Sequence, residues 1–242
     1  MTNKLRVLMM GLLFGVSPLV MAEETKLWSG EVSLTVTNNN GNTRSQNLGL
    51  KSRAVREGEV WRNTFKLDAL NESDNDERTA EKYLASIKFD RKFTEEDYLF
   101  LFLEHEKDDF GGYDYQSSFT TGYGRKLINT DVHKLEIEVG PGYRYNALLE
   151  ENDAGDKHET EALFRLASNY DWVINESATF RQELSVDAGE DITVSRSLTK
   201  LKTKVHNQLS LSVSYEIKYT SEVPQDTHKF DSVTILALDY SF

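Results

Sequence analysis

A histidine and a serine are the residues in this sequence most able to do chemistry together. His105 ends the run YLFLFLEH, and Ser117 follows a glycine-containing turn around Gly111. If the chain forms a hairpin at Gly111, the two side chains lie opposite each other on neighbouring strands and on the same face. A general base beside a hydroxyl is the first part of an activated nucleophile, so a lipid-modifying enzyme is one alternative function. No acid or amide on that face orients the imidazole, and we therefore expect no catalytic residues and no enzyme activity.

Two acidic segments offer a second kind of site, because carboxylates are common ligands of Ca²⁺ and Mg²⁺ in proteins. The two groups are Glu72, Asp74, Asp76 and Glu77, and then Glu150, Glu151, Asp153, Asp156 and Glu159. Neither group has the ligand spacing of a calcium-binding loop. The sequence also has no zinc spacing and no glycine-rich phosphate motif. We therefore expect solvated loops, no metal site and no cofactor.

The overall composition excludes several classes of protein. The chain of 242 residues contains 0 cysteines, which rules out disulfides, thiolate metal sites and a cysteine nucleophile. Its formal net charge of -12 argues against a nucleic-acid partner, because phosphate binding needs a basic surface. With 3 prolines and no low-complexity linker, one folded domain is the better interpretation.

The first residues are typical of a targeting segment that is separate from the fold. Lys4 and Arg6 are basic, residues 7–16 are apolar, and Pro18 follows shortly before Ala22 and Glu23. This is the pattern of a cleavable signal peptide. The apolar stretch is shorter than the ~20 residues of a membrane-spanning helix. We predict a signal peptide over residues 1–22, cleavage between Ala22 and Glu23, and one domain over residues 23–242.

The rest of the chain alternates apolar and polar residues at period two, which indicates strands. In LEIEVGPGYRY, for example, Leu135 and Ile137 share one face while Glu136 and Glu138 share the other. Similar runs recur along the whole chain, so we predict an all-β, closed antiparallel barrel of about twelve strands. Each run is long enough for the ~9–11 residues that a tilted strand needs to cross a bilayer.

Two segments leave the strand register open. The segment near Tyr98–Glu106 is apolar on both faces. In ITVSRSLTKLKTKV, over residues 192–205, the apolar parity changes between Leu198 and Leu201. Such a change predicts a β-bulge or a late strand start.

The connections between the expected strands alternate in kind. REGE, TEED, INTD, NES and HNQ are short, whereas NNNGNT, NESDNDER, EKDDFGGYD, ALLEENDAGDKHE, DAGED and SEVPQDTH tend to be longer and acidic. Short turns on one rim and longer loops on the other are typical of outer-membrane barrels, with both termini on the short-turn side.

Aromatic residues gather near the two expected rims, as they do at the two interfaces of a bilayer. The short-turn rim has Trp28, Trp61, Tyr98, Tyr123, Trp172, Phe180, Tyr240 and Phe242; the long-loop rim has Tyr83, Tyr113, Tyr115, Tyr145, Phe164, Tyr219 and Phe230. Aliphatic residues dominate between them, which favours an apolar face directed at lipid. A soluble periplasmic β-barrel binding protein, with the apolar face inside, is the alternative.

The sequence ends on an alternating run that closes with an aromatic residue. Leu236, Leu238, Tyr240 and Phe242 occupy every second position. Presented as an added strand, this run can give backbone hydrogen bonds and side-chain contacts together. We interpret it as an assembly signal for the barrel-assembly machinery, and we expect membrane lipids and lipopolysaccharide as the other partners.

Charged residues occupy the opposite face of the strands and would point into the lumen. The expected lumen charges are Lys51, Arg53, Arg62, Lys66, Lys88, Glu136, Glu138, Arg144, Arg165, Arg181 and Glu183, with Lys82 and Lys202 beside them. Their mixed signs allow two interpretations, an internal salt-bridge network that fills the barrel or a narrow charged channel. About twelve strands lie between the filled barrels of ~8 strands and the open channels of ~16–18 strands.

Several motifs resemble those of a known family. They are the Gly41, Asn42 and Thr43 turn, Trp61, the Asp109, Phe110, Gly111, Gly112, Tyr113 and Asp114 loop, and the Gly140, Pro141, Gly142, Tyr143 and Arg144 run. In these residues the chain is similar to the salt-induced outer-membrane protein family of Gram-negative bacteria, the YdiY-like proteins, whose domain has no known function. The resemblance implies an outer-membrane barrel and a link to salt or osmotic conditions. It implies no catalytic residues.

These observations predict a Gram-negative outer-membrane barrel of undetermined specific activity. The expected role is structural, within the envelope, or porin-like, as a narrow channel for small solutes.

Overall fold

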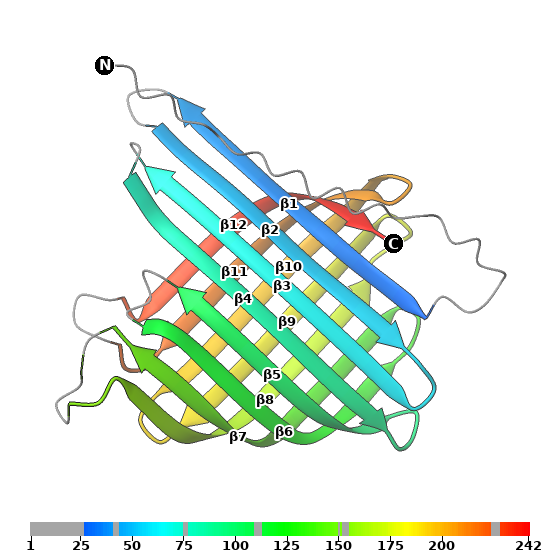
Figure 1. Cartoon of the computed structure of the whole chain (residues 1–242). Coiled ribbons are helices and arrows are strands. Elements are labelled where there is room, and N and C mark those ends of the chain that lie inside the picture. Colours follow the sequence, from blue (N-terminus) through cyan, green and yellow to red (C-terminus); the bar gives the residue numbers. More distant parts are fainter. Residues whose placement is uncertain are drawn as a thin grey trace.

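The computed structural model shows a closed antiparallel barrel of twelve strands (Figure 1), which confirms the predicted fold class. It describes residues 27–40, 44–74, 77–108, 113–149, 151, 155–223 and 228–242, and only the backbone at 37–40, 44–47, 74 and 77–80. The expected signal peptide, with Ala22 and Glu23, lies outside the described residues. No helix among the described residues is long and apolar enough to span a membrane.

The strands follow one another around the ring in chain order. They are β1 (Trp28–Asn40), β2 (Arg44–Glu57), β3 (Trp61–Asp74), β4 (Glu77–Lys92), β5 (Asp97–Asp108), β6 (Tyr113–Asn129), β7 (His133–Leu148), β8 (His158–Val173), β9 (Ala178–Gly189), β10 (Thr193–His206), β11 (Leu209–Thr220) and β12 (Phe230–Ser241). Each pairs with its sequence neighbours, and β1 pairs with β12 to close the barrel. The strands are strongly tilted in Figure 1, as closure of a sheet requires.

The connections confirm two rims but correct part of the expected loop pattern. β1 and β2 are separated only by residues 41–43, and β3 and β4 only by residues 75–76. The β5–β6 and β9–β10 connections are residues 109–112 and 190–192, so four of the six expected long loops are largely extensions of the strands. The longer connections are residues 149–157 and 221–229. Backbone hydrogen bonds in a hairpin do not need apolar side chains. The strands therefore extend beyond their apolar segments into the polar residues next to these turns. The first residue of β1, Trp28, and the last residue of β12, Ser241, both lie on the rim of the short turns.

The closing junction between β1 and β12 is short. Glu31 to Leu34 of β1 pair with Ser241 to Leu238 of β12, and Gly30 and Phe242 exchange two backbone hydrogen bonds of 3.0 Å. By contrast, β1 pairs with β2 from Trp28 to Asn40. Barrel closure therefore depends on a small number of residues at the chain ends.

The outer wall of the barrel is apolar and the lumen is polar. Leu34, Leu67, Leu166, Leu211 and Leu236 are among the many exposed aliphatic side chains on the outer wall, and Leu236 is 73% exposed. The groups with the least exposure include carboxylates such as Asp90 and Asp239, each 0% exposed. This arrangement is the reverse of a water-soluble barrel, in which the aliphatic side chains fill the centre.

Two aromatic residues expected on the outer wall point inward, which corrects the sequence prediction. Tyr98 is 1% exposed and donates hydrogen bonds from its hydroxyl to Glu136 and Glu138. Tyr113 is buried against Ile192, because a register shift between Tyr113 and Tyr115 changes the face of the strand. Tyr98 shares its parity with Phe100, so one face of β5 carries aromatic rings into the lumen.

The expected irregularity in β10 lies elsewhere. Leu198 and Leu201 are paired without interruption to β9 and β11, and the register shift falls between Lys204 and His206. Leu198 shares the inward parity of buried Val194, so the apparent change of parity reflects apolar residues inside the lumen.

Candidate functional site

Ion pairs join strands on opposite walls of the barrel. Lys66 of β3 contacts Glu183 of β9 at 2.7 Å, and these strands lie halfway around the ring from each other. Lys218 of β11 pairs with Glu106 of β5, which is also on the opposite wall. Side chains of opposite sign therefore meet across the lumen.

Glu106 is the centre of the cluster nearer the long-loop rim. Its carboxylate is 3% exposed and is contacted by Lys82 and Arg196 at 3.0 Å each, as well as by Lys218. Arg196 also approaches Asp187 at 3.5 Å. A carboxylate this deeply buried is stable only with such partners, because desolvating an unpaired charge is very costly.

A second cluster lies nearer the short-turn rim. The Arg62 guanidinium donates two hydrogen bonds to Glu136, at 2.6 and 2.9 Å, and one to Asp90 at 2.6 Å. Lys88 pairs with Glu138, and the Tyr98 hydroxyl donates to both glutamates. The bidentate geometry fixes the orientation of both partners, which makes this part of the lumen rigid.

The other predicted lumen charges also face inward. Lys51 pairs with Glu216, Arg144 with Glu161 at 2.7 Å, Arg165 with Asp187 at 2.8 Å, and Arg181 with Asp171 at 2.6 Å, while Lys202 contacts Glu31 at 2.6 Å. Arg53 is half-buried beside them, and its Nε has no hydrogen-bond partner. We call all the ion-paired inward residues the lumen network.

Several members of the lumen network were not among the lumen charges that the sequence predicted. They are Glu31, Asp90, Glu104, Glu106, Glu161, Asp171, Asp187, Arg196, Lys200, Glu216, Lys218 and Asp239. Glu104 and Glu106 follow the apolar part of β5, where alternation is poor. Glu104 and Glu106 lie on the same face of β5 as Tyr98 and Phe100. This shared parity would have predicted their inward position if the two aromatic rings had first been assigned to the lumen.

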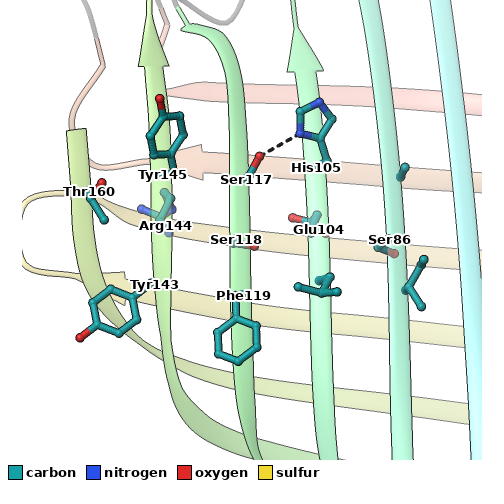
Figure 2. A pocket seen from close by; sticks show the side chains of 13 residues that line it. Ser86, Glu104, His105, Ser117, Ser118, Phe119, Tyr143, Arg144, Tyr145 and Thr160 are labelled. Carbon is teal, nitrogen blue, oxygen red and sulfur yellow. Dashed lines mark hydrogen bonds between the residues drawn. The ribbon is translucent and has the colours of Figure 1, made fainter. Parts of the chain in front are cut away.

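A second site lies on the outer wall, around the predicted His105 and Ser117 pair. The two residues are directly paired between β5 and β6, and His105 Nδ1 lies 2.8 Å from Ser117 Oγ (Figure 2). They border a groove with a volume of about 480 Å³, which we call the outer groove. Its lining residues include Ala85, Ile87, Leu103, Phe119, Tyr143, Tyr145 and Thr160.

A row of aromatic rings lies beside His105 on the long-loop side. The His105 ring lies 5.3 Å from the Tyr115 ring, Tyr115 stacks on Tyr145 at 5.9 Å, and Tyr145 stacks on His158 at 5.8 Å. These contacts position the imidazole without supplying a charge. A hydrolase triad also needs a third group that orients the imidazole, and no hydrogen bond from a carboxylate or amide to His105 is found among the residues that the structure describes.

The motif residues that the structure describes have architectural positions. A side chain at Gly140 would collide with the backbone of Thr121 and Gly122 on β6, so glycine allows the close approach of β6 and β7. Arg144 belongs to the lumen network, whereas Tyr143 is 61% exposed on the outer wall. Gly41, Asn42 and Thr43, and the loop of Asp109, Phe110, Gly111 and Gly112, lie outside the described residues.

The acidic segments present no metal site in the described ranges. No group of three or more histidine, cysteine, aspartate or glutamate side chains there could hold an ion. Asp76, Glu150 and Asp153 belong to the residues that are not described.

Three solved structures with a similar arrangement are distant from this chain in sequence. The NanC porin has a TM-score of 0.49 at 11% identity, covering 88% of this chain and 97% of the porin. The KdgM porin has a TM-score of 0.45 at 12% identity, covering 89% and 99%. The translocator domain of the autotransporter NalP from Neisseria meningitidis has a TM-score of 0.44 at 10% identity, covering 89% and 87%.

Similarity in sequence is more informative. The uncharacterized protein YdiY of Escherichia coli (strain K12) is 31% identical over 221 residues, which covers 91% of this chain and 85% of that protein. Residues 32–242 match the family described as protein of unknown function, DUF481. This confirms the resemblance drawn from the glycine and aromatic motifs, and the chain belongs to the DUF481 family of YdiY-like proteins.

Proposed function

We propose that this protein is an outer-membrane barrel with a structural role in the Gram-negative envelope and a lumen that is closed at rest. The observation that carries the proposal is the set of ion pairs between opposite walls, Lys66 with Glu183 and Lys218 with Glu106. Such pairs occupy the axis that a permeating solute would have to follow. The exposed aliphatic side chains of the outer wall support the placement in lipid.

The closed state has a clear electrostatic basis. Buried pairs are screened by salt much less than exposed ones, because water and counterions do not surround them. Removing one partner of a buried pair leaves an uncompensated charge, which costs about 3–5 kcal/mol. Opening a wide path through the lumen would break several such pairs together.

Planar-bilayer recordings test this proposal. We expect purified wild-type protein to give no stepwise current. Glu106→Ala leaves Lys82, Arg196 and Lys218 without their shared carboxylate, so mutual repulsion should open the lumen and produce current steps. Thr203→Val, an exposed outer-wall substitution, is the matched control and should stay silent. Regular steps from the wild-type protein would instead support the narrow channel for small solutes.

A link with salt conditions completes the proposal, and the family resemblance is what suggests it. A deletion strain should lose envelope integrity at high salt, measured as detergent sensitivity, and recover with the wild-type gene. Equal sensitivity of both strains at every salt concentration would remove this part of the proposal.

A further inference from the structure

We propose that the outer groove is a binding site for an ester-linked, zwitterionic diacyl glycerophospholipid such as phosphatidylethanolamine. One acyl chain lies in the groove, and the ester carbonyl accepts a hydrogen bond from the His105 and Ser117 pair. This inference rests on the membrane placement proposed above and assigns a ligand to a specific place on the wall.

The groove is built from two rows of side chains on neighbouring strands. Strand pairing places Ile87, Leu103, Phe119 and Tyr143 in one row, nearer the middle of the wall. Ala85, His105, Ser117, Tyr145 and Thr160 form the next row toward the long-loop rim. The small residues Ala85 and Ser117 stand beside large ones, and this difference in size creates the hollow. Figure 2 shows Phe119 and Tyr143 below the polar pair.

The apolar row matches an acyl chain. Leu103, Phe119 and Tyr143 are 40%, 42% and 61% exposed, so their surfaces are available to a ligand on the outer wall. A volume of about 480 Å³ is within the range of about 300–1,000 Å³ of ordinary ligand sites. An apolar hollow that ends at a polar pair is the form expected for a ligand with an apolar chain and one polar anchor.

In either hydrogen-bonding arrangement, the His105 and Ser117 pair keeps one polar hydrogen that it can donate to a ligand. If Ser117 donates to His105 Nδ1, the imidazole Nε2–H remains; if Nδ1–H donates to Ser117 Oγ, the hydroxyl hydrogen remains. In hydrocarbon, a donor without an acceptor costs more than a donor exposed to water. The ester carbonyl of a lipid can accept this hydrogen. The His105 and Ser117 pair lies close to the tyrosines of the long-loop rim, which is the depth at which lipid acyl chains meet their headgroups.

The rim above the groove carries both signs of charge. Lys107 follows His105 by two positions on the same face of β5, and exposed Asp114 lies at the start of β6. A headgroup with one phosphate and one ammonium complements this mixture. A lipid A headgroup carries two phosphates and no ammonium, and it fits the Asp114 carboxylate less well.

Native mass spectrometry of the folded protein with a synthetic phosphatidylethanolamine tests the site. The ester lipid should bind wild-type protein about tenfold more tightly than its ether-linked analogue, which has no carbonyl, since one hydrogen bond is worth about that factor. In Ser117→Ala/His105→Leu the preference should vanish. Ala85→Phe, which fills the groove, should weaken both lipids, and Thr203→Val should weaken neither.

Three results would overturn the assignment. Equal affinity of wild-type protein for the ester and ether lipids removes the role of the carbonyl, and this comparison needs no variant to fold. Tighter binding of lipid A excludes the zwitterionic ligand. Release of a fatty acid and a lysolipid would make Ser117 a nucleophile and the groove an active site. Failure of wild-type protein to insert into vesicles would reject the membrane placement instead, whereas insertion without ester preference rejects this inference alone.

Discussion

At the scale of single residues, the lumen shows how charge can be buried in the middle of a barrel. Arg144 is 4% exposed, and it donates to Glu161 at 2.7 Å and to the Ile192 carbonyl at 2.9 Å. Every such contact replaces one that the guanidinium would make with water. The complete Arg144–Glu161 pair therefore contributes little to the net free energy of folding, whereas removal of one partner is strongly destabilising.

This contrast between complete and broken pairs gives a residue-scale prediction. Arg144→Ala should lower the free energy of unfolding by about 3–5 kcal/mol, because it leaves the buried Glu161 carboxylate without its cationic partner. The backbone N–H groups of Asp191 and Ile192 still donate to this carboxylate. Arg125→Ala is the control: Arg125 pairs with Glu96 at 2.9 Å, but both side chains are about half exposed. Arg125→Ala should lower the free energy of unfolding by less than about 1 kcal/mol. Urea titration in lipid vesicles measures both, and equal costs would contradict the burial argument.

At the scale of the strands, the junction of β1 and β12 is the feature that closes the barrel. Its few paired residues include Ser241, and Phe242 exchanges backbone hydrogen bonds with Gly30. A side chain at Gly30 would overlap the ring of Phe242, so glycine at this position lets the terminal ring lie against β1. The C-terminal run is thus part of the closure itself.

Substitutions on either strand of the β1–β12 junction should slow assembly of the barrel. Gly30→Leu displaces the Phe242 ring and Phe242→Ala removes it, so both should slow assembly of the barrel into vesicles by several-fold. Leu209→Ala, on the neighbouring β11 at the same rim, keeps the junction and should assemble at the wild-type rate. Heat-dependent mobility in gels reports the folded fraction with time. Normal assembly of Gly30→Leu would show that the ring contact is unimportant.

At the scale of the whole molecule, the outer wall decides between a membrane barrel and a soluble one. Leu166 in the middle of β8 is 52% exposed, and its neighbours on the wall are also apolar. In water an exposed leucine on a strand is readily replaced by a polar residue. In a bilayer the same position faces hydrocarbon.

Leu166→Arg separates these two environments. At the bilayer midplane an arginine costs about 2–4 kcal/mol, so folding into vesicles should be weakened by this amount. For a water-exposed position the change is usually within about 0.5 kcal/mol. Leu27→Arg, just before β1 on the short-turn rim, is the depth control and should be tolerated. An unaffected Leu166→Arg protein would reject the membrane placement.

The candidate sites were only partly predictable from the sequence. The pairing of His105 with Ser117 could be derived, because a hairpin places residues at equal distances from its turn opposite each other. The inward position of Tyr98 could not, since its segment is apolar on both faces. Tyr113 was misplaced because one register shift moves a side chain to the other face.

The sequence by itself predicted about twelve strands, each with an apolar and a polar face, because the period of two is a local property of each strand. It also determined the family, through motifs that lie within single turns and strands. Only the tertiary structure decided which charges meet, since closure brings β3 to β9 and β5 to β11 across a lumen that no local pattern describes. The width of that lumen depends on strand tilt and register around the whole ring, and for this reason the ion pairs across it appear only in the folded barrel.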